Sequence, residues 1–147
     1  MRQRSIRAGV PAARIAALPP AALDVYLRSI GGADIALDTT PYSGGTTTCD
    51  ALWMGVPVVA LRGSRSISRS AASILSTVGL ADWIAATRED YVRLAERFAR
   101  DETLLAELRG SLRQKMRLSP IMDEPAFVRD LEGAYRTMWR VWCEGIS

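Results

Sequence analysis

Histidine is absent from this chain of 147 residues, and cysteine occurs only twice. Without histidine the chain itself can supply no Ser-His-Asp triad, no histidine general base and no histidine ligand to a metal. Cys49 and Cys143 lie far apart and in no paired motif, so a disulfide framework or a zinc site is not expected. We therefore expect neither a metal ion nor another cofactor.

Long apolar runs and clustered positive charge are missing as well. No stretch approaches the roughly 20 apolar residues of a membrane helix. The basic start MRQRSIRAGV leads into no apolar run, so we expect no signal peptide and a cytoplasmic protein. The net charge is +3, but the arginines are spread among Glu and Asp, which is more typical of solvated helix surfaces than of a nucleic-acid footprint. Membranes and nucleic acids are not expected as partners.

The first half of the chain alternates short apolar runs with helical patterns. The apolar runs lack strict polar alternation, which favours parallel strands buried on both faces, over residues 14–18, 34–38 and 56–61. Helices are predicted between and after these strands, over residues 24–30, 46–54 and 66–78. The last of these helices would bury Ile67 on the same face as Leu75. We predict the α/β class, with a Rossmann-like parallel sheet and flanking helices.

The second half of the sequence is helical throughout. Thr87 is expected to cap one helix, and residues 105–116 carry the apolar stripe of the next. A last helix begins near Asp123, with an apolar stripe formed by Phe127, Leu131, Tyr135, Met138 and Trp142. We expect an α/β part over residues 1–85 and a helical segment over residues 86–147 packed on the same domain.

The segment with a chemical signal runs from Ala33 to Val59. Gly44 and Gly45 allow the backbone to approach a ligand closely, and Thr46, Thr47 and Thr48 follow at a helix N-terminus. Unpaired N–H groups and the helix dipole favour a phosphate there. Asp50 lies one helical turn further, within reach of a ribose hydroxyl. A tight turn with a threonine cap and an early helical acid would give the same pattern, and neither the Walker loop nor the GxGxxG fingerprint is present.

Four parts of the chain resemble the O-GlcNAc-transferase/SPINDLY glycosyltransferase family. LDTTPYSGGTTTCDALWMGVPVV is similar to the family's core motif, and SRSAAS at residues 68–73 is similar to its SRxAAS element. Asp90-Tyr91 and Tyr135-x-x-Met138-Trp139 extend the resemblance to the end of the chain. It implies part of the C-terminal lobe of a GT-B enzyme that carries a sugar from UDP-GlcNAc or GDP-fucose to a protein hydroxyl. The LWMGVPVV run disfavours a sugar-nucleotide epimerase.

The resemblance also implies roles for single residues. Thr46 and Thr47 would contact the pyrophosphate and Asp50 the ribose, while Ala21 would meet the base through its backbone and Tyr26 would stack on it. Gly44, Gly45 and Thr48 complete the expected nucleotide-sugar site. Arg69, in the SRxAAS element, is either a further phosphate contact or part of a solvated helix start.

Two departures from the animal members favour the bacterial or SPINDLY branch. Gly45 stands where animal members have a histidine, and Leu23 stands where they have a ribose-binding lysine.

The chain has fewer predicted strands than a complete GT-B lobe, and nothing in it resembles the family's TPR region. We expect it to be inactive alone and to need the N-terminal lobe, against which Tyr135, Trp139 and Trp142 would pack. A non-catalytic α/β module that binds a nucleotide or a partner remains the alternative.

Overall fold

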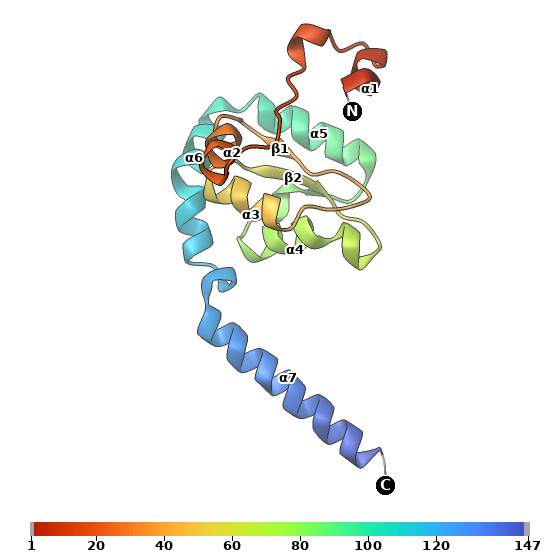
Figure 1. The fold of residues 1–147 in the computed structure, drawn as a ribbon, viewed down its shortest axis with the longest axis vertical. Helices are drawn as coiled ribbons and strands as arrows, with labels where there is room; N and C mark the ends of the chain where they lie inside the picture. The colour runs from red at the N-terminus through yellow and green to blue at the C-terminus, as the bar shows by residue number, and fades with distance from the viewer. Residues whose placement is uncertain (1, 146–147) are drawn as a thin grey trace.

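The computed structural model describes residues 2–145 and has an α/β architecture around a small parallel sheet. Its strands follow the spatial order β1-β2-β3 and span Ala36–Leu37, Val58–Leu61 and Ile84–Ala85. The register pairs Ala36 with Val58 and Ala60 with Ile84. Helices α3 (Thr46–Trp53) and α4 (Ser70–Thr77) cover one face of the sheet, and α5 (Arg88–Ala99) covers the other (Figure 1). The predicted fold class is confirmed.

The core is built around the central strand, β2. Val59 and Ala60 are completely buried, as expected for a parallel strand with helices on both faces. Leu52 of α3 and Leu75 of α4 are fully buried as well, and each contributes about 1.5–3 kcal/mol relative to an exposed side chain. Near the sheet edge the rings of Trp83 and Phe98 stack with centroids 3.8 Å apart.

The residues predicted to cap or end helices largely do so in the structure. Gly55 has a φ of +80° and ends α3, where a Cβ would lie only 2.7 Å from the carbonyl oxygen of Arg109. The hydroxyl of Thr87 accepts a hydrogen bond from the N–H of Asp90 and caps α5. The carboxylate of Asp123 caps the last helix in the same way.

Two predicted elements are wrong. Residues 14–18 form no strand, and residues 12–14 form a 3-10 turn with no buried residue. Leu18 is 71% exposed, because no sheet lies beside this segment. The third strand of the sheet is β3, which sequence reasoning missed.

The predicted helix 66–78 is in fact two pieces, a 3-10 turn over Ser66–Ser68 and α4, and Ile67 is exposed. A continuous helix would need the N–H of Ala71 to donate to the carbonyl of Ile67. Instead, Ser43 comes between them. Its N–H donates to the Ile67 carbonyl oxygen at 3.1 Å, and its hydroxyl accepts from the Ala71 N–H at 2.9 Å.

Helix α6 (Glu102–Arg117) forms hydrogen bonds to the carboxyl ends of two preceding helices, α2 (Leu23–Gly31) and α3. The Arg109 guanidinium donates to the carbonyl oxygens of Gly31 at 2.7 Å and Ala33 at 2.6 Å. Arg113 donates to the carbonyl oxygen of Trp53 at 2.8 Å and lies over the indole ring of that residue. These arginines satisfy carbonyl groups that the ends of α2 and α3 leave free.

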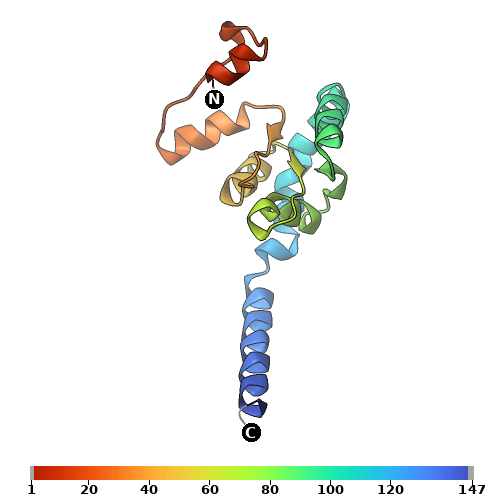
Figure 2. The same ribbon diagram turned by 90° about the vertical axis from the view of Figure 1, so that its right-hand side faces the viewer.

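The two ends of the chain leave the α/β core. The N-terminal helix α1 (Arg2–Arg7) lies beyond the sheet, and α7 (Glu124–Glu144) projects away from the core in both views (Figures 1 and 2). No residue of α7 is buried. Within residues 2–145, no helix is both long and apolar enough to span a bilayer. The proposed division at residue 85 stays a prediction.

Candidate functional site

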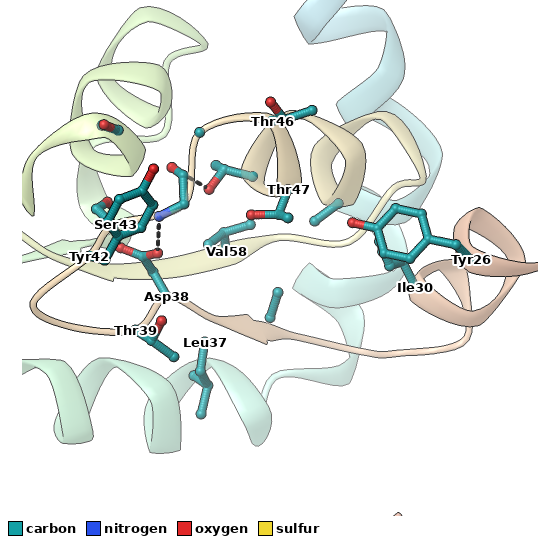
Figure 3. Close-up of a pocket in the computed structure, with 16 residues that line it drawn as sticks. Tyr26, Ile30, Leu37, Asp38, Thr39, Tyr42, Ser43, Thr46, Thr47 and Val58 are labelled. Carbon is teal, nitrogen blue, oxygen red and sulfur yellow. Dashed lines mark hydrogen bonds between the residues drawn. The ribbon is translucent and has the colours of Figure 1, made fainter. Parts of the chain in front are cut away.

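A hollow of about 680 Å³ lies beside β1 and extends beyond its carboxyl end. Residues 42–48, the turn that leads into α3, form one wall, and Tyr26 and Ile30 of α2 border the hollow further along (Figure 3). The place agrees with the general rule for parallel α/β sheets, in which ligands bind beyond the carboxyl ends of the strands. Gly44, Gly45 and the three threonines all line the hollow.

The turn offers free backbone donors to the hollow. The N–H groups of Thr48 and Cys49 both donate to the carbonyl oxygen of Gly45, at 3.0 and 3.1 Å. Within residues 2–145, the N–H groups of Gly45, Thr46 and Thr47 have no acceptor in the protein. Three adjacent free amides at the positive end of a helix form a favourable environment for an anion such as a phosphate.

The threonines of the turn differ in their surroundings. Thr46 and Thr47 are exposed, and their hydroxyl groups are available to a ligand. Thr48 is buried, and its hydroxyl donates to the carbonyl oxygen of Gly44 at 3.0 Å. Thr48 therefore stabilises the turn, whereas the hydroxyl groups of Thr46 and Thr47 are exposed in the hollow.

The two glycines also differ. A Cβ on Gly44 would lie 2.8 Å from the hydroxyl oxygens of both Thr47 and Thr48, so this position has no room for a side chain. A Cβ on Gly45 would meet nothing within 4 Å. Gly44 permits a close contact within the protein, and Gly45 leaves the wall of the hollow open.

Sequence reasoning missed Asp38 and Ser43, both of which line the hollow. The Asp38 carboxylate accepts a hydrogen bond from the Gly44 N–H at 2.7 Å and another from the Ser43 hydroxyl at 2.8 Å. Figure 3 shows Asp38 directly beside the turn. The signal available in the sequence was the position of Asp38 directly after the apolar run that forms β1.

Tyr26 and Asp50 meet between α2 and α3. The Tyr26 hydroxyl donates to the Asp50 carboxylate at 3.2 Å. Burial raises the pKa of Tyr26, and the hydrogen bond to Asp50 and the charge of that carboxylate raise it further. Burial also raises the pKa of the neighbouring Cys49 thiol, with a smaller contribution from the charge of Asp50. Tyr26 lines the hollow, whereas Asp50 is outside its lining and is connected to it through the hydrogen bond with Tyr26.

The structure does not bring the last two predicted residues to the turn. Ala21 is exposed in the segment before α2 and lies outside the lining of the hollow. Arg69 lines a separate hollow of about 700 Å³ beside α4 and β3, together with Arg62. In the part of the chain that the structure describes, no cluster of three His, Cys, Asp or Glu side chains could hold a metal ion.

Comparison with known proteins connects this arrangement to glycosyltransferases. The sequence pattern described as glycosyl transferase family 41 matches residues 1–131. A protein of Eustoma exaltatum subsp. russellianum, named probable UDP-N-acetylglucosamine–peptide N-acetylglucosaminyltransferase SPINDLY, is 44% identical over 138 residues, which cover 93% of this chain and 15% of that protein. The UDP-N-acetylglucosamine–peptide N-acetylglucosaminyltransferase of Caenorhabditis elegans is 31% identical over 99% of this chain and 13% of that protein.

A solved structure is similar as well. A mutant of the Thermobaculum terrenum O-GlcNAc transferase superposes with a TM-score of 0.89 at 40% sequence identity, over 99% of this chain and 29% of that chain. The chain thus spans 13–15% of the length of these two curated relatives and less than a third of this solved neighbour.

Proposed function

Since the chain belongs to glycosyl transferase family 41, we propose that it forms the part of a protein O-glycosyltransferase that binds the nucleotide-sugar donor. The observation that carries this proposal is the row of three free amides, on Gly45, Thr46 and Thr47, at the wall of the hollow beside β1. A diphosphate is the group of a nucleotide sugar that such a row would hold.

The proposed donor lies along the hollow from the turn to α2. The diphosphate is held by the free amides together with the hydroxyls of Thr46 and Thr47. The ribose reaches Asp50, and the base stacks on Tyr26 at the far end. Asp50 has two carboxylate oxygens and only one accepts from Tyr26, so the other is available to a ribose hydroxyl.

The proposed chemical role of the turn is to stabilise negative charge that develops on the donor diphosphate during sugar transfer. When the bond between sugar and diphosphate breaks, negative charge grows on the diphosphate. Fixed N–H donors and a helix dipole that already point at that group stabilise the charge without reorganising. We assign UDP-GlcNAc or GDP-fucose as the donor and a protein hydroxyl as the acceptor, in a cytoplasmic enzyme of bacterial type with no metal ion or other cofactor.

The acceptor site and the remaining catalytic groups are proposed to lie in polypeptide outside this segment, in an N-terminal lobe and a TPR region. The longer lengths of the relatives support this assignment, since the chain covers only 29% of the solved neighbour. The exposed apolar side of α7 supports it as well, because aromatic clusters of this kind usually mark a contact surface.

Calorimetric titration of the chain with UDP, GDP, UDP-GlcNAc and GDP-fucose tests the proposal. We expect one diphosphate series to bind, and Asp50→Ala to weaken that binding by roughly 1–3 kcal/mol, as for a hydrogen bond to a charged group. Thermal unfolding of the same variant is the control. A loss of stability without a loss of affinity would make Asp50 a structural helix acid, and a folded chain that binds none of the four ligands would overturn the proposed function.

A further inference from the structure

Asp38 stands directly after β1, and its main chain is fixed on two sides. Its N–H donates to the carbonyl oxygen of Val59 at 2.9 Å and continues the pairing of β1 with β2. Its own carbonyl oxygen accepts from the Tyr91 hydroxyl of α5 at 2.8 Å. The residue is therefore part of the rigid sheet, although it lies at the edge of the hollow.

The carboxylate of Asp38 connects this fixed point to the turn. One oxygen accepts from the Gly44 N–H at 2.7 Å, and the other accepts from the Ser43 hydroxyl at 2.8 Å. The Ser43 hydroxyl also accepts from the Ala71 N–H at the start of α4, at 2.9 Å. Because Ser43 is buried, these bonds are shielded from competing water. One carboxylate thus joins β1, the turn and, through Ser43, α4.

The charge of this carboxylate is the informative point. A negative side chain at the edge of a hollow that is proposed to take a diphosphate repels the ligand, so Coulomb forces alone favour a neutral residue there. Asp38 nevertheless engages the Gly44 N–H, and the free donors begin at the next residue, Gly45. Hydrogen bonds between a carboxylate and backbone N–H groups are short and strong, which suits a role in fixing the direction of the turn.

We propose that Asp38 is a positioning residue: it holds the turn in the conformation that presents the amides of Gly45, Thr46 and Thr47 to the donor diphosphate, and it does not contact the donor. This inference rests on the proposed function of the hollow. Electrostatic repulsion alone predicts that removing the Asp38 charge strengthens the binding of an anion. A positioning role predicts instead that its removal weakens that binding.

Titrations with UDP and with uridine, or with GDP and guanosine if the chain binds the guanine series, test the inference on the whole chain when they are followed by NMR at up to millimolar ligand. Asp38→Ala should weaken UDP binding roughly tenfold or more, while uridine, which lacks phosphates, should change by less than about twofold. Asp38→Asn should fall between Asp38→Ala and the wild type. Its amide oxygen can still accept from Gly44, but its amide nitrogen cannot accept from the Ser43 hydroxyl.

Thr87→Ala is the matched control, because it removes the cap of α5 and lowers stability without touching the turn. It should bind UDP as the wild type does. Unchanged or tighter UDP binding in both Asp38 variants would overturn the inference, and so would an equal loss for UDP and uridine, which indicates a general structural defect. If Asp38→Ala does not fold, Asp38→Asn carries the comparison. A wild-type chain that fails to bind UDP, GDP or their sugars would instead overturn the proposed function.

Discussion

At the scale of single residues, Gly44 and Gly45 are identical neighbours with different physical roles. Gly44 sits against the hydroxyl groups of Thr47 and Thr48, and a methyl group there forces its neighbours apart. Gly45 borders open space and is followed directly by the exposed Thr46. A substitution at Gly44 acts on folding, and one at Gly45 acts on the hollow.

We therefore expect Gly44→Ala to cost roughly 1–3 kcal/mol of stability, as for overpacking of a tight site. The midpoint of thermal unfolding should fall by about 3 °C for each kcal/mol lost. Gly45→Val should unfold close to the wild-type temperature but bind UDP more weakly, because its side chain occupies space beside the free amides. Thermal scans and UDP titrations of both variants check this pair. Wild-type UDP affinity in Gly45→Val would argue against the turn as the diphosphate site.

The sequence predicts the turn but not its support. Gly44 through Thr47 are recognisable because a glycine pair next to a helix start is a local pattern. Asp38 and Ser43 act through bonds to residues brought close by the fold, as in the contact of Ser43 with Ala71 across 28 positions. An acid directly after a strand was the only local hint. Whether Arg69 binds a ligand stays a prediction, and it lies in a different hollow from the turn.

At the scale of elements, the helices and strands that could be predicted are those with a long apolar pattern in the sequence. β2 and the helices α5 and α6 each have several apolar residues at the spacing of their element, and both their existence and their type are confirmed. β3 contains only two residues, which is too few to show any period. Residues 14–18 have the apolar composition of a strand, but strand formation requires a neighbouring strand, and this segment has none.

The ends of α3 and α4 allow a matched test of helix termination. Gly55 and Gly79 follow these helices with φ values of +80° and +79°, so alanine at either position meets the same unfavourable backbone conformation. Only at Gly55 would the new methyl group also collide, with the Arg109 carbonyl oxygen of α6. Gly79→Ala should cost about 1 kcal/mol, and Gly55→Ala distinctly more.

Urea unfolding of the two variants measures this difference directly. Gly79→Ala serves as the control, because a Cβ there meets nothing within 4 Å. Equal losses would show that α6 moves aside freely and that its close approach to the end of α3 is not a fixed feature of the fold.

At the scale of the whole molecule, α7 projects away from the core and carries an exposed apolar surface (Figure 1). The side chains of this surface recur at helical spacing along the length of α7: Phe127, Leu131, Tyr135, Met138, Trp139 and Trp142. Trp139 and Trp142 are 67% and 63% exposed, which is unusual for residues of this size. The predicted stripe is present, and within residues 2–145 no side chain of α7 is buried.

The chain alone should therefore transfer no sugar in an assay with radiolabelled donor and peptide acceptors, because orientation of the acceptor requires groups outside it. Adding the preceding lobe of a relative should restore activity. Trp142→Glu should abolish that restoration while leaving the UDP affinity of the chain unchanged. Arg140→Glu lies on the opposite side of α7 and is the control. Turnover by the chain alone, or restored activity with Trp142→Glu, would contradict this use of α7.

The arginine contacts of α6 have a consequence for synthesis on the ribosome. All three strands have been synthesised once residue 85 is added. Arg109, however, binds Gly31 across 78 positions, and Arg113 binds Trp53 across 60 positions. Until those side chains emerge, the carbonyl oxygens of Gly31, Ala33 and Trp53 lack their arginine donors and the side of the core that α6 covers is exposed. The growing chain therefore remains accessible to chaperones and proteases. The core can therefore be completed only after α6, which ends at Arg117, has emerged. α7 emerges later, when the core is already complete.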